Sequence, residues 1–97
     1  MTFIHRFSRS VSCTLEITDE PTEPGTSHIK DVVWTGRPKS KHLTEYVYWM
    51  HSVNSHLADL WQMKIMYAVQ SSPAVWEFWG YEPGKPPKRI TGEALTK

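Results

Sequence analysis

At 97 residues the chain has the size of one domain, and its 39% hydrophobic and 22% charged residues are typical of a globular protein rather than a disordered one. Eleven Lys and Arg against ten Asp and Glu give a formal net charge of +1, which predicts no strong general attraction to nucleic acid or to an anionic membrane. The single cysteine, Cys13, excludes an intramolecular disulfide, and no apolar run reaches the length of a signal peptide or of a membrane span. We therefore expect one domain over residues 1–97, located in the reducing cytoplasm.

Residues 2–18 are predicted to be extended. Within them Val11, Cys13, Leu15 and Ile17 alternate with polar residues, the period-2 pattern of a strand with one buried face. The pattern leaves open whether the first residues form a strand of their own or continue the same strand through a bulge.

A second strand is predicted over 28–35, where β-branched residues gather before Gly36 and Pro38. The segment 19–26 contains two Pro and one Gly and is acidic, so it predicts an exposed loop. We expect this loop to join the strands at 11–18 and 28–35 into an antiparallel hairpin.

One long helix is predicted over about 41–70, a run without Pro or Gly in which apolar residues return every three or four positions. Ser40 is the expected N-cap, with Thr35 as the alternative, and Pro73 opposes continuation at the other end.

This predicted helix has more apolar residues than one core-facing stripe requires. Trp49, Met63, Met66 and Tyr67 fall outside the stripe. A helix on a single sheet needs one apolar face, so a second partial face predicts either another layer or a partner.

The segment 74–81 is predicted to be a third strand, with Trp76 and Phe78 on one face and Glu77, Trp79 and Tyr81 among the residues of the other. Rings on both faces predict that this strand is covered on both sides or that it exposes aromatic surface.

The predicted fold is a small α+β domain, in which an antiparallel sheet of three to four strands (2–18, 28–35 and 74–81) packs on the long helix. The tail over 82–97 holds three of the seven Pro and is expected to be extended or loosely ordered.

The sequence offers little for catalysis or metal binding. His42, His51 and His56 are nine and five residues apart, which turns successive imidazoles about 180° and 140° away from each other on a helix. No nucleophile elbow, dinucleotide-binding or P-loop motif occurs. We expect no metal, no cofactor and no enzyme activity; a small enzyme would need polar groups to converge near Cys13, His51 or Asp59.

Basic residues form local clusters despite the low net charge. One cluster precedes and begins the helix, where acidic side chains would be usual, a second lies in the tail, and a third pair lies near the first strand. If the clusters converge beside exposed rings, they would suit single-stranded nucleic acid; otherwise they are separate solvated charges. The residues are Arg37, Lys39, Lys41 and His42; Lys85, Lys88 and Arg89; and Arg6 and Arg9.

Large rings are in excess, with five Trp, four Tyr and three Phe, and such side chains dominate both cores and interfaces. The residues predicted to contact a protein partner are Tyr48, Trp49, Met63, Tyr67, Trp76, Trp79 and Tyr81.

The predicted function is accordingly that of a small non-catalytic interaction protein that binds another protein or macromolecular complex through aromatic surface. An inhibitor of a host complex, encoded by a phage or a mobile element, would suit such a chain. A homodimer would satisfy the ring pattern as well as a foreign partner would. The alternative is a nucleic-acid-binding accessory protein that uses the clusters at 37–42 and 85–89; no membrane partner is expected.

Overall fold

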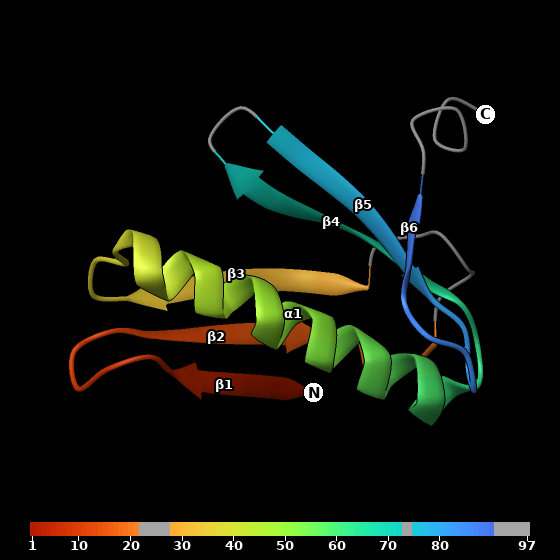
Figure 1. Ribbon diagram of the computed structural model, residues 1–97. Helices are drawn as coiled ribbons and strands as arrows, with labels where there is room; N and C mark the ends of the chain where they lie inside the picture. The colour runs from red at the N-terminus through yellow and green to blue at the C-terminus, as the bar shows by residue number, and fades with distance from the viewer. Residues whose placement is uncertain (22–27, 73–74, 91–97) are drawn as a thin grey trace.

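A computed structural model describes residues 1–21, 28–72 and 75–90 of the chain (Figure 1). Within these ranges one helix and two separate antiparallel sheets form an α+β fold, which confirms the predicted class. The elements are β1 (Thr2–Arg6), β2 (Ser12–Ile17), β3 (Ile29–Thr35), α1 (Ser40–Trp61), β4 (Ile65–Ser72), β5 (Val75–Tyr81) and β6 (Lys88–Ile90). Strands β1-β2-β3 form what we call sheet A, and β4-β5-β6 form sheet B, where the sequence predicted one sheet.

Sheet A follows the alternation of the sequence closely. The apolar residues of its central strand, Cys13, Leu15 and Ile17, are fully buried, and their polar neighbours are not. The predicted hairpin is confirmed, with Cys13 opposite Trp34. A turn in which the Phe7 N–H donates to the Val11 carbonyl, at 2.9 Å, separates β1 from β2, so the N-terminal residues form a strand of their own.

The prediction of a helix over 41–70 is wrong beyond Trp61. Gln62 adopts the left-handed conformation, with φ 53° and ψ 42°, and its backbone N–H donates to the Ala58 carbonyl, which ends the helix. The next residues form β4 and pair with β5 from Ile65 opposite Tyr81 onward. Pairing with a distant strand here overrides a local pattern that also fitted a helix.

The start of α1 also differs from the expected Ser40 cap. Lys39 is the N-cap, and its backbone N–H donates to Nδ1 of His42 at 3.0 Å. Thr35, the alternative cap, is the last residue of β3. The first turn of α1 contains no acidic residue.

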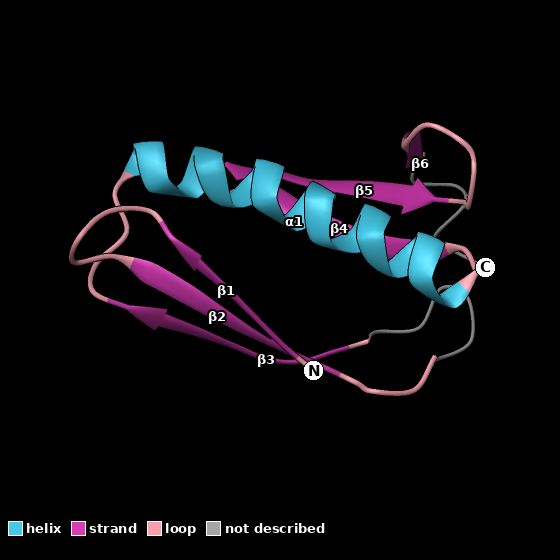
Figure 2. Ribbon diagram, turned by 90° about the horizontal axis from the view of Figure 1, so that it is seen from below, coloured by secondary structure: helices cyan, strands magenta, loops and turns pink. Residues whose placement is uncertain are grey.

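Both apolar faces of α1 are covered by the chain itself (Figure 2). Toward sheet A, the ring of Trp49 stacks on that of His5 with centroids 5.3 Å apart. Toward sheet B, His51 lies against Tyr67 with centroids 5.4 Å apart. The second face of the helix predicted another layer or a partner, and sheet B is that layer.

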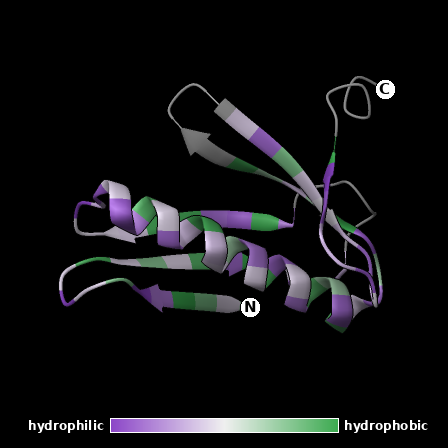
Figure 3. Ribbon diagram, viewed as in Figure 1, coloured by the Kyte–Doolittle hydropathy of each residue, from purple (hydrophilic) through white to green (hydrophobic). Residues whose placement is uncertain are grey.

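The buried side chains therefore form one core with contributions from all three layers. Sheet A supplies three members, α1 four and sheet B four: Cys13, Leu15, Ile17, Met50, Val53, Leu57, Ala58, Ile65, Tyr67, Val69 and Tyr81. Green residues recur along α1 between purple ones in the hydropathy view, which is the pattern of a helix buried along part of its circumference (Figure 3).

The tail predicted to be extended over 82–97 contributes the short strand β6, with Ile90 opposite Phe78. Residues 91–97 lie outside the described residues, as does most of the loop predicted over 19–26.

We expect Gly36→Ala to lower the free energy of unfolding by about 3 kcal/mol, measured by urea denaturation. Gly36 has φ +80°, and a Cβ there would lie 2.1 Å from the Ser10 carbonyl oxygen. The matched control is Gly84→Ala, since Gly84 has φ +76° but no described atom within 4 Å of its would-be Cβ. It should cost only about 1 kcal/mol, the strain of the backbone alone. Equal losses in the two variants would contradict the close approach of the loop at Gly36 to the turn at Ser10.

Candidate functional site

The outer face of sheet B, on the side away from α1, carries apolar side chains from all three strands. Strand alternation places them there: β4 turns Tyr67 and Val69 into the core, so the residues between them point outward. Trp76 is 55% exposed. The outer face consists of Met66, Ala68, Trp76, Phe78 and Ile90.

Phe78 lies at the centre of this outer face. It pairs with Ala68 on one side and with Ile90 on the other, so the three side chains form a row across the sheet. Ala68 and Trp76 are exposed, and the remaining members are half-buried. The sequence predicted that the β5 strand would either be covered on both faces or expose aromatic surface; α1 covers the inner face, and the outer face exposes Trp76.

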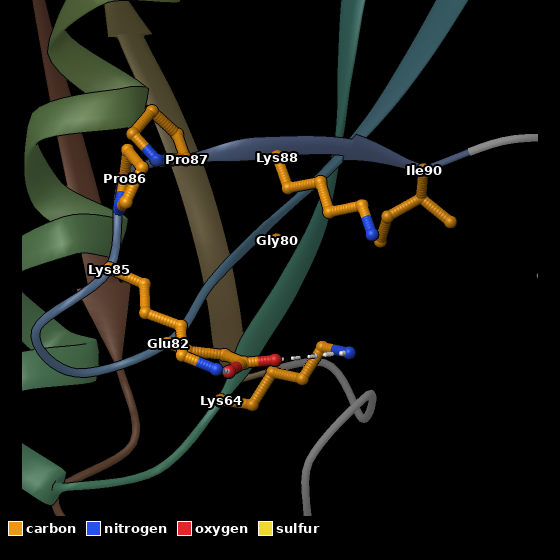
Figure 4. Close-up of a pocket in the computed structure, with 8 residues that line it drawn as sticks. All are labelled: Lys64, Gly80, Glu82, Lys85, Pro86, Pro87, Lys88 and Ile90. Carbon is orange, nitrogen blue, oxygen red and sulfur yellow. Dashed lines mark ion pairs between the residues drawn. The ribbon is translucent and has the colours of Figure 1, made fainter.

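A groove of about 430 Å³ borders the outer face and shares Ile90 with it (Figure 4). Gly80 lies between Ile90 and Lys64, since a Cβ there would be in van der Waals contact with Cδ1 of Ile90 at 3.4 Å and with Cε of Lys64 at 3.7 Å. The lining residues come from β5, β6, the turn between them and the residue before β4: Lys64, Gly80, Glu82, Lys85, Pro86, Pro87, Lys88 and Ile90.

The groove has an excess of positive charge. Glu82 forms ion pairs with Lys85 at 3.0 Å and with Lys64 at 3.8 Å, and its pKa is lowered by the hydrogen bond and the charge of Lys85. Lys88 forms no ion pair with any residue in the described ranges. The groove thus holds three ammonium groups and one carboxylate at the edge of an apolar sheet face, and two of the ammonium groups pair with that carboxylate.

The seven residues predicted to bind a protein do not form one surface. Trp76 belongs to the outer face of sheet B, whereas Tyr48 is 70% exposed on the solvent side of α1. Tyr67 and Tyr81 are core residues, 8% and 5% exposed, with their rings stacked at 5.6 Å. Their assignment to a binding surface is corrected because their strands turn them toward the helix.

The other three predicted residues are half-buried and pack against the core. Trp49 contacts sheet A through His5, and Trp79 lies against His51 with ring centroids 5.1 Å apart. Met63 lies in the turn between α1 and β4. Sequence reasoning placed Phe78 on the correct face with Trp76 but missed Met66 and Ala68, because it interpreted their strand as helix.

The basic clusters at 37–42 and 85–89 lie at opposite ends of α1 (Figure 1). The helix has 22 residues and is therefore about 33 Å long. Arg37, Lys39 and Lys41 are exposed, but His42 is 6% exposed and belongs to the protein interior. In the second cluster Arg89 approaches Glu77 at 3.9 Å. The two clusters do not form a common surface.

The polar groups considered for catalysis are also separated. Cys13 is fully buried in sheet A, and burial raises the pKa of its thiol to about 11, so the thiol stays protonated at neutral pH. Asp59 is exposed on α1, whereas His51 faces sheet B. Among the residues described, no three His, Cys, Asp or Glu side chains come together as metal ligands would. No helix within the described ranges is long and apolar enough to cross a membrane.

A hydrogen bond joins Nδ1 of His51 on α1 to the hydroxyl of Tyr67 on β4. Burial raises the pKa of Tyr67 far above its ordinary value, and a hydrogen bond to Tyr81 adds to the effect. Burial lowers the pKa of His51, while the charge of Glu77 partly opposes this. His51 and Tyr67 are therefore neutral at neutral pH, and the hydrogen bond between them attaches sheet B to the helix.

We expect the stability of the protein to fall as the pH drops below about 6.5, the ordinary pKa of histidine. The pKa of His51 is depressed in the folded state, so the unfolded state takes up a proton first and is favoured as the pH falls. The contribution of His51 to this slope cannot exceed that of one proton, about 1.4 kcal/mol per pH unit. Unfolding in urea at several pH values should show a flatter profile for His51→Gln, while His56→Gln, at an exposed helix position, should keep the wild-type slope. If the free energy of unfolding of His51→Gln varied with pH as steeply as that of the wild type, His51 would not be the source of the pH dependence.

Comparison of the chain with protein-family models, curated proteins and solved structures finds no match.

Proposed function

We propose that this chain is a non-catalytic binding protein that docks another protein onto the outer face of sheet B. The observation that supports the proposal is the exposure of Trp76, 55%, beside the row of apolar side chains formed by Ala68, Phe78 and Ile90 on the same sheet face. Tryptophan is the residue type most often found as an energetic anchor at the centre of an interface. Single exposed apolar residues are ordinary on protein surfaces, but a group that spans three strands is typical of a contact surface.

The charges at the edge of this face indicate the chemistry of the partner. The adjoining groove is lined by Lys64, Lys85 and Lys88 and by one carboxylate, that of Glu82, which leaves an excess of positive charge. A partner segment with an apolar side chain for the row around Phe78 and a carboxylate for Lys88 would match both parts. We therefore expect the partner to contribute apolar residues flanked by Asp or Glu.

The nucleic-acid alternative loses its original basis, because it relied on the clusters at 37–42 and 85–89 acting together. They are separated by the length of α1 (Figure 1). The narrower proposal of a phage-encoded or mobile-element-encoded inhibitor requires the partner to be a host complex, so the identity of the partner decides it. A second copy of the chain would also be a protein partner, and the molar mass in solution distinguishes this case from a foreign partner.

Trp76→Ala should abolish capture of the partner when purified wild-type and variant chains are used as baits in lysate of the native host. A large exposed ring that anchors an interface contributes 2 kcal/mol or more, which corresponds to about a thirtyfold loss of affinity. The partner retained by the wild type is then purified, and its affinity for each variant is measured by titration calorimetry. Because Trp76 is on the surface, the variant should keep its free energy of unfolding within about 1 kcal/mol.

The matched control is Tyr48→Ala, which removes an exposed ring from the opposite side of the helix and should leave partner binding unchanged. A partner that binds Trp76→Ala as tightly as the wild type would contradict the proposal. Loss of binding in Tyr48→Ala alone would place the contact on α1 instead of on sheet B. Light scattering of the pure chain that gives twice the mass for the wild type and a monomer for Trp76→Ala would identify the partner as a second copy.

A further inference from the structure

We propose that the end of the molecule around the N-terminus of α1 is a second binding surface, which takes the sugar-phosphate backbone of single-stranded nucleic acid and stacks a base on Tyr48. The surface, which we call the basic end, consists of Arg9, Arg37, Lys39 and Lys41. It is distinct from the outer face of sheet B, and the proposal does not depend on that face.

Two segments that are distant in sequence meet at the basic end. The turn between β1 and β2 touches the loop between β3 and α1, since a Cβ on Gly36 would lie 2.1 Å from the Ser10 carbonyl oxygen. Arg6 is not part of this surface, because it pairs with Ser12 in a row that faces away from α1, whereas the neighbouring Cys13 faces the core. Figure 1 shows the two loops and the start of α1 at the same end of the molecule. Of the basic residues considered from the sequence, those at the start of α1 therefore lie near Arg9, and those of the tail cluster do not.

The cations of the basic end are available to a ligand. All four are exposed, and none forms an ion pair with a described residue. The nearest carboxylate along the helix, Glu45, is held by Nε2 of His5 at 2.7 Å. Both loop tips are coloured as hydrophilic in Figure 3. The whole chain carries only +1, so a local excess of positive charge at this end is balanced by acidic residues elsewhere.

Tyr48 supplies the second component of the surface. It is 70% exposed and follows Lys41 by seven residues, which places both side chains on the same side of α1 and about 10 Å apart along its axis. Cations that neutralise phosphates next to a ring that can stack on a base are the combination by which proteins hold single strands. A duplex keeps its bases stacked within the helix, and an acidic peptide has no base, so the exposed ring favours a single strand over both.

The first experiment measures the anisotropy of a fluorescein-labelled oligothymidylate of about 20 nucleotides, a probe of ordinary site size, over a range of salt concentrations. Wild-type protein should bind with an affinity that falls steeply with salt. The variant Arg9→Glu, Arg37→Glu, Lys41→Glu should lose at least about tenfold in affinity at low salt and reduce the slope of log K against log salt by about 2, the loss of three phosphate contacts.

The matched control is Lys85→Glu, Lys88→Glu, Arg89→Glu, which changes the charge equally at the other end of α1 and should alter affinity less than about threefold. Equal losses in the two triple variants would overturn the proposal, because the binding would then report net charge alone. Absence of oligothymidylate binding by the wild type, or equally tight binding of polyglutamate, would also overturn it.

The second experiment tests the stacking. Tyr48→Ala should weaken binding of the single strand about fivefold or more, while Tyr48→Phe, which keeps the ring, should retain the wild-type affinity. A blunt-ended duplex of the same length should not distinguish Tyr48→Ala from the wild type. Trp76→Ala should leave oligothymidylate binding unchanged, which separates this surface from the proposed protein-binding face. Unchanged affinity of Tyr48→Ala for the single strand would refute the role of the ring.

Discussion

The packing of α1 against two sheets on two sides is the constraint on which this structure depends. Sheets A and B are separate ladders, and the core that joins them passes through side chains of the helix such as Met50, Val53 and Leu57. A chain of this length can bury only a limited area, so a helix that serves two layers is an economical arrangement. It also explains the many rings, because each Trp or Tyr spans more of the space between layers than an aliphatic side chain would. Half-buried rings such as Trp34, Tyr46 and Trp49 fill the wedge between α1 and sheet A.

The sequence was sufficient to predict the hairpin of β2 and β3, since the alternation over residues 11–18 fits only a strand, but it left open whether β1 is a separate strand. It was not sufficient to end the helix. Ile65 and Ala68 continue the three-and-four spacing of α1, and Ile65, Tyr67 and Val69 equally well alternate as a strand. No Gly or Pro marks the end of α1 in the sequence. Gln62 instead adopts the left-handed conformation that glycine usually supplies at this position. Ile65–Ser72 form a strand because they pair with β5, and a local sequence pattern does not reveal this long-range interaction.

The same ambiguity decides how much of the candidate site could be predicted. The second apolar face of the helix correctly indicated a further layer, but Met66 and Tyr67 were counted as part of the helix that needed covering, whereas they belong to the sheet that covers it. Tyr67 was consequently expected on the surface and lies in the core. Trp76 and Phe78 were assigned to one face correctly, because a strand fixes the relative orientation of alternate side chains whatever its partner is. The sequence did not indicate which of the two faces of β5 would be covered by α1.

Net charge averages over positions that the fold separates. The basic end and the lysine-rich groove lie at opposite ends of a helix about 33 Å long, several times the Debye length of about 8 Å at physiological salt. Each surface is therefore sensed by a ligand almost independently of the other. The first turn of α1 reinforces the difference between them, because it forgoes the acidic residues that would stabilise the helix by about 0.3–1 kcal/mol each and presents Lys39 and Lys41 instead. Within this fold that choice lowers the stability of the helix, and the proposed single strand would offset this cost by placing phosphates where an aspartate or glutamate would otherwise lie.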